Sequence, residues 1–452
     1  MKQEAYLQVC KNKFKVKNTV FIYLVFFLLS FFKYTKYIDL KHQTLSHSSL
    51  SENNKQNKMK IQVLFAIVAL VFSNIVLGQE TCTPASAGDP NVDDGPAITK
   101  ALETCGNGGT IIIPAGKTYT IRSAFDFTGC NGCTFQIEGT LKASDDLAYW
   151  EGRNAMFTFS NVNRAKFYSL TGSGTFDGSG QKFWDHFAVN STYRRPFLIY
   201  FRNASDVTFT KLTVLDSPFW CININESSTR ITFSDVNVTA ISKTTSRPAN
   251  TDGFDTVECS HVSIVNSYVH NGDDCVSFKN GSNFITVENI TCIDSHGLSV
   301  GSLGSTPGRP HMVSNVYVSN AKMIDSAFAT RIKFYPSGPR HGPVFIHNIT
   351  YKDIIMENCD YGFLVDNCYE SNKTECQDHP GTAIVSNVRF TNIAGTTSKA
   401  HDPVVAKIEC PPEGTCDLAF DQWNVVAPSG GHTVLCGYYH NPIGITCTPG
   451  AI

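Results

Sequence analysis

Four short polar clusters interrupt the otherwise apolar central part of the sequence. They are Asn250-Thr251-Asp252, Gly272-Asp273-Asp274, Ser295-His296-Gly297 and Arg331-Ile332-Lys333. Carboxylates held close together repel, so one stays protonated and can act as an acid while the others act as bases. The arginine can bind an anion through its planar fork, and the lysine through a compact charge. These residue types predict hydrolysis of an anionic sugar by acid–base chemistry, without a metal or another cofactor.

The spacing of the clusters indicates that they form one site. Asp252 and Asp273 are 21 residues apart, and Asp274 and His296 are 22 apart. If the chain coils with this length, the residues stack on successive coils, whose strands are about 4.8 Å apart. Taken singly, Asp-Asp beside glycine is usually a turn, and Arg-x-Lys is usually a solvated strand face. Their joint occurrence in step with the coil is what predicts a shared site.

A repeated phrase supports this coil length. Each copy has a small polar residue, a polar residue and then alternating β-branched or aromatic residues. The first five copies start 24, 31, 22 and 32 residues apart. This period predicts an all-β fold, a solenoid of the β-helix type, because the alternative antiparallel sandwich lacks self-similar coils. The copies begin at Ser205, Thr229, Ser260, Ser282, Ser314 and Ser386.

A short helix is predicted at the N-terminal end of the solenoid. Asp94, Ala97, Ile98, Ala101, Leu102 and Cys105 have helical spacing, and the segment 106–109 is a glycine-rich stop. Such a helix would cap the open edge of the first coil and so prevent aggregation. No internal linker is evident, so residues 79–452 are predicted to form a single domain.

The N-terminal region reads as a leader. Residues 59–78 begin with Met59-Lys60, continue as an apolar run and end at Gly78, the pattern of a secretory signal peptide. A membrane anchor fits less well, since the run is short and no basic cluster follows it. Residues 1–58 contain a second apolar run, Val20 to Phe32, and are interpreted as a gene-model extension or an additional leader.

Composition agrees with an exported globular protein. The chain has 452 residues, 42% hydrophobic and 17% charged, which excludes a disordered protein. After residue 78 there are 26 basic and 36 acidic residues, so a nucleic acid partner is not expected. Fifteen of the sixteen cysteines lie in this part, which predicts disulfides with one free thiol. Eight Asn-x-Ser/Thr sequons, together with the signal peptide, predict a secreted, extracellular glycoprotein. Once the signal peptide is removed, no membrane attachment is expected.

In this order and spacing, the four clusters resemble those of the polygalacturonases, family 28 of the glycoside hydrolases. The resemblance covers roughly residues 88–450 and implies a right-handed parallel β-helix. It also implies hydrolysis of α-1,4-linked galacturonate in polygalacturonate or pectin, with inversion, by a monomer. The longer matches are Asn250-Thr251-Asp252-Gly253-Phe254-Asp255, Gly272-Asp273-Asp274-Cys275-Val276, His296-Gly297-Leu298-Ser299-Val300-Gly301-Ser302 and Arg331-Ile332-Lys333.

The resemblance implies a catalytic role for four residues. Asp273 corresponds to the general acid, Asp252 and Asp274 to the pair that activates water, and His296 to the group that supports the acid. Coil stacking alone would place the carboxylates about 5 Å apart, a separation associated with retention of configuration. We nevertheless expect inversion, because the family match is more specific than the stacking estimate.

Substrate contacts and one disulfide are also implied by the resemblance. Arg331 and Lys333 would hold the galacturonate carboxylate beside the scissile bond. Asn250 and Tyr369 would contact substrate, Tyr369 by a looser match in Asp366-Asn367-Cys368-Tyr369. Cys275 and Cys292 resemble a family disulfide that brackets the active coil.

The mode of cleavage is predicted from one departure in the third cluster. The sequence has Asp294-Ser295-His296-Gly297, whereas endo-acting members typically have Gly-Gly-His-Gly. This favours exo action at the non-reducing end, with segments 242–249 and 337–342 as candidate blocking loops. The alternatives left open are an endo-polygalacturonase, a rhamnogalacturonan or xylogalacturonan hydrolase, and a non-catalytic pectin-binding protein. A calcium-dependent pectate lyase is disfavoured by the three aspartates with His296.

Overall fold

The structure is a computed structural model that describes residues 80–449. The chain from Gln79 to Ile452 forms one compact unit. The predicted signal peptide at residues 59–78 and the predicted extension at residues 1–58 lie outside the described residues. Within the described part of the chain, no helix is long and apolar enough to cross a membrane.

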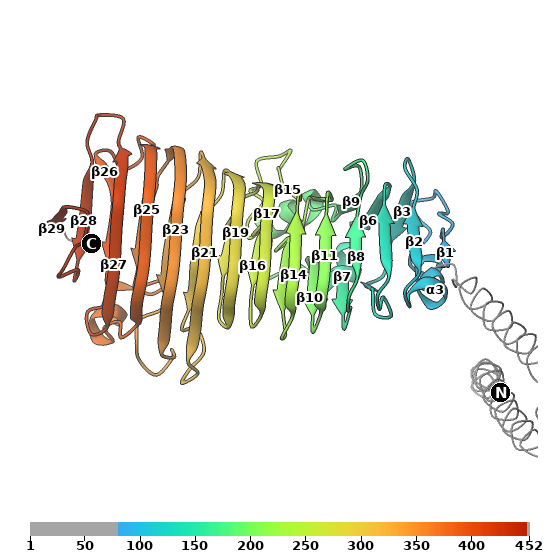
Figure 1. Ribbon diagram of the computed structural model, residues 1–452, viewed down its shortest axis with the longest axis horizontal. Coiled ribbons are helices and arrows are strands. Elements are labelled where there is room, and N and C mark those ends of the chain that lie inside the picture. Colours follow the sequence, from blue (N-terminus) through green and yellow to red (C-terminus); the bar gives the residue numbers. More distant parts are fainter. Residues whose placement is uncertain (1–79, 450–452) are drawn as a thin grey trace, which may run out of the picture. The chain divides into compact units, whose positions relative to one another are not determined.

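The predicted β-helix is confirmed. The strands pair in parallel and form two sheets, one of 17 strands and one of 12. Figure 1 shows the coils stacked along the long axis of the unit, from β1 at one end to β29 at the other. Each coil contributes to both sheets, so residues one coil apart in sequence become neighbours in space.

The 12-stranded sheet comprises β4 (Phe125–Asp126), β7 (Ala155–Ser160), β10 (Phe197–Arg202), β13 (Ile222–Asn225), β16 (Phe254–Thr256), β18 (Val276–Phe278), β20 (Leu298–Leu303), β22 (Phe328–Phe334), β24 (Tyr361–Asp366), β26 (Val404–Glu409), β28 (Thr433–Gly437) and β29 (Cys447–Pro449). The 17-stranded sheet comprises β1 (Thr81–Cys82), β2 (Thr110–Ile113), β3 (Thr118–Ile121), β5 (Thr134–Ile137), β6 (Thr140–Ala143), β8 (Lys166–Tyr168), β9 (Thr175–Asp177), β11 (Ser205–Thr210), β12 (Thr213–Leu215), β14 (Thr229–Ser234), β15 (Asn237–Thr239), β17 (Ser260–His270), β19 (Ser282–Ile293), β21 (His311–Ile324), β23 (Val344–Cys359), β25 (Ile384–Thr397) and β27 (Thr415–Val426).

Each copy of the repeated phrase begins a strand where its coil enters the 17-stranded sheet. Ser205 pairs with Thr229, and Thr229 pairs with Ser260, so the first copies stand in register. The sequence search missed the copy that begins at His347, which pairs with both Ser314 and Ser386. It was missed because histidine replaces the small polar residue that defined the start of the phrase.

Aromatic side chains form columns inside the solenoid. The rings of Phe127, Phe159 and Phe201 stack with 4.5 Å between successive centroids. Tyr351, Phe390 and Phe420 form a second column, with centroids 5.2 and 4.7 Å apart. These rings are almost entirely buried. The columns follow from the register, because parallel in-register strands place equivalent side chains directly above one another.

The predicted capping helix is present as α3 (Gly95–Cys105), with Ile98, Leu102 and Cys105 buried against the first coils. Three further short helices are α4 (Leu147–Trp150), α5 (Gln181–Val189) and α6 (Lys373–Asp378). The described residues contain six disulfides, Cys82–Cys105, Cys130–Cys133, Cys275–Cys292, Cys368–Cys376, Cys410–Cys416 and Cys436–Cys447. The expectation of one free thiol is wrong: Cys221, Cys259 and Cys359 are all buried and unpaired, because each fills an interior position where it acts as a small apolar side chain.

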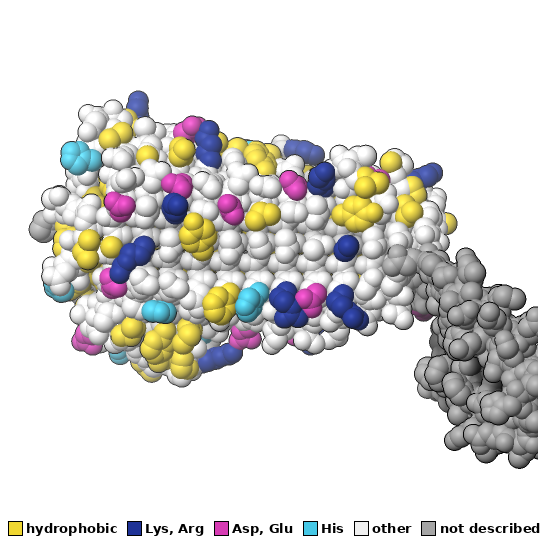
Figure 2. All heavy atoms as spheres, in the orientation of Figure 1, with side chains coloured by type: hydrophobic (Ala, Val, Ile, Leu, Met, Phe, Trp, Pro, Cys, Tyr) yellow, Lys and Arg dark blue, Asp and Glu magenta, His cyan; other side chains and the backbone are white. Residues whose placement is uncertain are grey.

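A ladder of asparagines joins successive coils along the 17-stranded sheet. The amide of Asn315 donates to Asn283 at 2.8 Å, that of Asn348 to Asn315 at 2.7 Å, and that of Asn387 to Asn348 at 3.1 Å. Asn315, Asn348 and Asn387 have φ between 53° and 58°, which asparagine tolerates better than most residues. In the view of Figure 2 most of the surface is backbone and uncharged polar side chains, with charged and hydrophobic side chains scattered over it.

The ladder predicts a measurable difference between two substitutions at Asn315. Asn315→Ala loses two rungs and must hold an unfavourable φ of 55°, so it should lower the free energy of unfolding by about 2 kcal/mol. Asn315→Gly loses the rungs alone and should cost about 1 kcal/mol. Urea unfolding monitored by circular dichroism would measure both. Asn424→Ala, at an exposed strand position outside the ladder, is the control; equal midpoints for all three variants would contradict the argument.

Candidate active site

The three carboxylates and the imidazole come together at one edge of the 12-stranded sheet. Strands β16, β18 and β20 pair with an offset of 22 residues in each step. Asp252, Asp274 and His296 therefore occupy equivalent positions on three successive coils, directly before these strands. The backbone N–H of His296 donates to the Asp273 carbonyl at 2.8 Å, which fixes the last of these coils against the middle one.

Asp273 lies one residue before this column and is bound by three donors. His296 Nδ1 is 3.0 Å from its Oδ1, the Asp274 N–H donates to the same oxygen at 2.8 Å, and Asn250 Nδ2 donates to Oδ2 at 3.4 Å. Burial raises the pKa of Asp273, but the hydrogen bond from His296 and the charge of Lys333 outweigh it. The pKa of Asp273 is therefore held well below its ordinary value.

Arg247 fixes the tautomer of His296. Its Nη2 lies 2.6 Å from His296 Nε2. Because a guanidinium can only donate, Nε2 must be the unprotonated acceptor, and the ring proton must lie on Nδ1. Nδ1–H then donates to Asp273. Arg247 thereby orients the imidazole toward the carboxylate.

Asp274 is fully buried and is held by two donors from later coils. Ser299 Oγ donates to Oδ1 at 2.7 Å, and Lys333 Nζ donates to Oδ2 at 2.8 Å. The Cys275–Cys292 disulfide, with an S–S distance of 2.02 Å, ties the residue after Asp274 to the next coil. Lys333, predicted to bind substrate, is therefore paired within the site, and its ammonium compensates a buried negative charge.

A second buried lysine compensates Asp252. Lys279 Nζ lies 3.6 Å from Asp252 Oδ2 and 3.2 Å from Asp255 Oδ1. Burial and the charges of Asp255 and Asp273 raise the pKa of Asp252 well above its ordinary value, although Lys279 lowers it. Burial likewise raises the pKa of Asp255 to about 7 against the effect of Lys279. Asp252 and Asp255 therefore tend to stay protonated at a pH at which Asp273 is already ionised.

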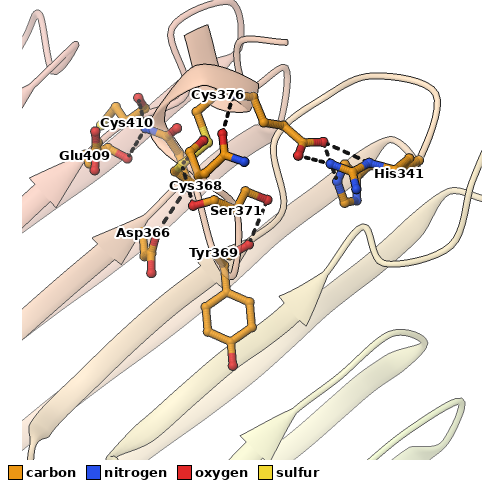
Figure 3. The surroundings of a disulfide bond; sticks show 12 residues. His341, Asp366, Cys368, Tyr369, Ser371, Cys376, Glu409 and Cys410 are labelled. Carbon is orange, nitrogen blue, oxygen red and sulfur yellow. Dashed lines mark hydrogen bonds and ion pairs between the residues drawn. A yellow bond between two sulfur atoms is a disulfide. The ribbon is translucent and has the colours of Figure 1, made fainter. Parts of the chain in front are cut away.

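Arg331 and Tyr369 complete the side of the site toward the C-terminus. Arg331 Nη2 is 3.5 Å from Asp366 Oδ2, and its Nε has no hydrogen-bond acceptor among the described residues. The cationic groups of Arg331 and Lys333 both lie 5.3 Å from the Tyr369 ring centroid. Figure 3 shows that the Cys368–Cys376 disulfide fixes the loop that carries Tyr369, whose ring points away from the disulfide and over the strands.

Asn250, predicted to contact substrate, is instead an internal connector in this structure. Its Oδ1 accepts from Arg195 Nη2 at 2.8 Å while its Nδ2 points to Asp273. Arg195 is buried and also donates to the carbonyls of Pro218 and Ala249, at 3.0 and 2.6 Å. Asn250 therefore links the fixed guanidinium of Arg195 to the carboxylate of Asp273 and helps to hold that carboxylate in place.

Sequence reasoning missed Arg195, Arg247 and Lys279. Lys279 left a detectable signal, since it is a lysine at the end of the apolar strand β18, where a charge requires a buried partner. Arg247 lies in the segment 242–249, which was considered only as a blocking loop. Arg195 lies two coils before the carboxylates, and no spacing rule connects it with them.

Asp273, Asp274 and His296 have ligand atoms within 4.8 Å of one another, close enough to hold a metal ion. Two of these donors are already bound to cations, Asp274 to Lys333 and His296 to Arg247. A divalent ion would have to displace both cations. The donor set therefore fits a metal poorly.

Comparison with known proteins identifies the family. The Glycosyl hydrolases family 28 profile matches residues 105–447. The chain is 44% identical over 370 residues to the endo-xylogalacturonan hydrolase A of Aspergillus tubingensis, covering 82% of this chain and 91% of the relative. It is 43% identical over the same length to the probable endo-xylogalacturonan hydrolase A of Aspergillus fumigatus, with the same coverage.

Solved structures agree with this result. The crystal structure of the endo-xylogalacturonan hydrolase from Aspergillus tubingensis matches with a TM-score of 0.81, covering 82% of this chain and all of that one. The polygalacturonase from Erwinia carotovora, 18% identical, matches with a TM-score of 0.64 over 82% of this chain and 97% of that one, and shares the fold. With a family match over most of its length and relatives at more than 40% identity, this chain belongs to glycoside hydrolase family 28.

Proposed function

We propose that this enzyme cleaves the galacturonan backbone of a pectic polysaccharide, within the chain, and that xylogalacturonan is its substrate. The observation that carries the proposal is the convergence of three carboxylates and His296 beside Arg331 and Lys333. The relatives named as endo-xylogalacturonan hydrolases support the choice of substrate. The six disulfides support the prediction that the enzyme works outside the reducing cytosol.

In the proposed reaction, Asp273 donates its proton to the glycosidic oxygen as the bond to the anomeric carbon breaks. A water between Asp252 and Asp274 adds to that carbon and gives up a proton to this pair. The configuration inverts, since the water attacks from the face opposite the leaving group. His296 positions Asp273, and Arg331 with Lys333 binds the carboxylate of the adjacent galacturonate.

Asp273 must be protonated to act as the acid, whereas its surroundings lower its pKa. Substrate binding should raise this pKa in two ways. A galacturonate carboxylate beside Lys333 offsets the charge that lowers the pKa of Asp273. Exclusion of water by the sugar deepens the burial that raises it.

The exo mode predicted from Asp294-Ser295-His296-Gly297 finds no support in the relatives, whose names favour the xylogalacturonan alternative. The structure gives a physical reason for doubting that signal. Ser295 is fully buried and its hydroxyl lies 3.1 Å from that of Ser326. A serine that faces the interior cannot itself obstruct a sugar chain, so its presence says little about where the polymer ends.

Asp273→Asn should lower kcat by at least about 1,000-fold, because the amide cannot supply the proton to the leaving oxygen. Reducing-end release from xylogalacturonan would measure the loss, with circular dichroism to establish folding. Asp206→Asn, a surface change that breaks an exposed pair with Arg230, is the matched control and should be active. Near-normal turnover in a folded Asp273→Asn variant would disprove the proposed acid.

Early products distinguish the two modes of cleavage. Protein beginning at Gln79 should convert xylogalacturonan to a ladder of oligosaccharides while less than a few per cent of the bonds are cut. It should act more slowly on unbranched polygalacturonate. Chromatography of both digests would show this. Release of single residues alone would establish the exo mode instead, and no cleavage of either polymer would refute the proposed function.

Lys279→Met should move the acidic limb of the pH–rate profile upward. Lys279 lowers the raised pKa values of Asp252 and Asp255, so without its charge both rise further. Asp252 would then ionise and act as a base only at higher pH, and the limb in kcat/KM should shift by on the order of one unit. Lys279→Arg keeps the charge and should restore the profile. An unchanged limb in a folded Lys279→Met variant would remove Asp252 from its proposed role.

A further inference from the structure

Three aromatic rings lie beside the carboxylates on the side toward the N-terminus. Phe219 and Trp220 directly precede β13, and Phe197 begins β10; we call these three residues the aromatic platform. Their planes lie within 26° of parallel, and their centroids are 5.1–5.6 Å apart. The sheet order places β13 next to β16 and β10 next to β13. The platform therefore continues the edge on which Asp252 and Asp274 lie.

The aromatic platform touches the catalytic groups through one lysine. Lys279 Nζ is 4.4 Å from the Trp220 ring centroid and 3.6 Å from Asp252 Oδ2. The Arg195 guanidinium lies 5.1 Å from the Phe219 centroid. A sugar bound on these rings would thus be separated from Asp252 by the Lys279 side chain alone.

The rings do not behave like the structural columns of this fold. Phe127, Phe159 and Phe201 are completely buried inside the solenoid. Phe197, Phe219 and Trp220 are only partly buried and lie outside it. Parallel aromatic rings held partly in solvent leave apolar surface exposed, and the apolar C–H face of a pyranose can pack against such a surface.

The charges around the platform select a neutral sugar. Lys279 is engaged by Asp252 and Asp255, and Arg195 donates to two carbonyls and to Asn250. A galacturonate placed here would lose water from its carboxylate without gaining a free cation, which is unfavourable. The free hydrogen-bonding capacity for an anion lies on the other side, at Arg331.

We propose that the aromatic platform is the binding subsite for a neutral pentose, the xylosyl branch of the substrate. This rests on the proposed function, since it assigns a place to the feature that separates xylogalacturonan from polygalacturonate. The backbone galacturonate would be held through its carboxylate by the cations, while the branch next to it lies on Trp220 and Phe219.

The test measures binding in the inactive Asp273→Asn background. The probes are xylogalacturonan and the same polymer after removal of its xylose, compared by affinity electrophoresis. Adding Trp220→Leu or Phe219→Leu should weaken binding of the xylosylated polymer at least about fivefold and that of the stripped polymer less than twofold. Trp220→Tyr keeps a ring and should preserve the preference. Phe284→Leu, an exposed ring on the other sheet, should change neither.

The proposal is overturned if the platform variants weaken both polymers equally, if they weaken neither, or if the Asp273→Asn protein does not prefer the xylosylated polymer. Thermal unfolding of Trp220→Leu checks that the fold is retained, and the tyrosine variant covers the case in which leucine is not tolerated. This result is separate from the proposed function. If binding depends on the rings but the wild type shows no turnover, the proposed hydrolase function is refuted and the subsite is supported. If turnover occurs and is unaffected by loss of the rings, the subsite is refuted and the hydrolase function is supported.

Discussion

The structure depends on one constraint, the in-register stacking of successive coils. Each side chain lies one strand spacing from its counterpart in the next coil. Every column must therefore consist of side chains that can pack against, or bind to, neighbours of the same kind. Columns of phenylalanine satisfy this by stacking, and the column from Asn283 to Asn387 satisfies it by donating and accepting in turn. The catalytic column is the exception. It places Asp252 and Asp274 on neighbouring coils, where two buried charges of one sign repel.

The site resolves this repulsion by giving each carboxylate a separate compensating partner. Lys279 lies beside Asp252, Lys333 binds Asp274, and His296, backed by Arg247, binds Asp273. The partners come from different coils and from a loop, so the column itself stays intact. The compensation is unequal, and that inequality is useful. The pKa of Asp252 is raised and that of Asp273 lowered, which separates groups of one chemical type into different protonation states.

The same constraint explains what the sequence could predict. Residues in one column recur at the coil length, so Asp252, Asp274 and His296 could be grouped from spacing alone. Two of the supporting cations, Arg247 and Arg195, could not, because Arg247 approaches from a loop and Arg195 from two coils away. The copy at His347 was missed because the stacking tolerates histidine where the phrase required a small residue. The number of free thiols was underestimated because Cys221, Cys259 and Cys359 serve as buried apolar side chains, which no count of cysteines distinguishes from paired ones.

The two sides of the catalytic column differ in chemistry, and this bears on how a polymer lies across it. Toward the C-terminus are Arg331 and Lys333, with the Tyr369 ring fixed over them by a disulfide. Toward the N-terminus are Trp220 and Phe219, whose neighbouring cations are already engaged. A uniformly charged chain gains electrostatic binding on one side only. A chain that carries neutral branches beside its carboxylates can use both sides, the carboxylates at Arg331 and the branches at Trp220 and Phe219. The proposed subsite thus favours a branched chain over a uniformly charged one.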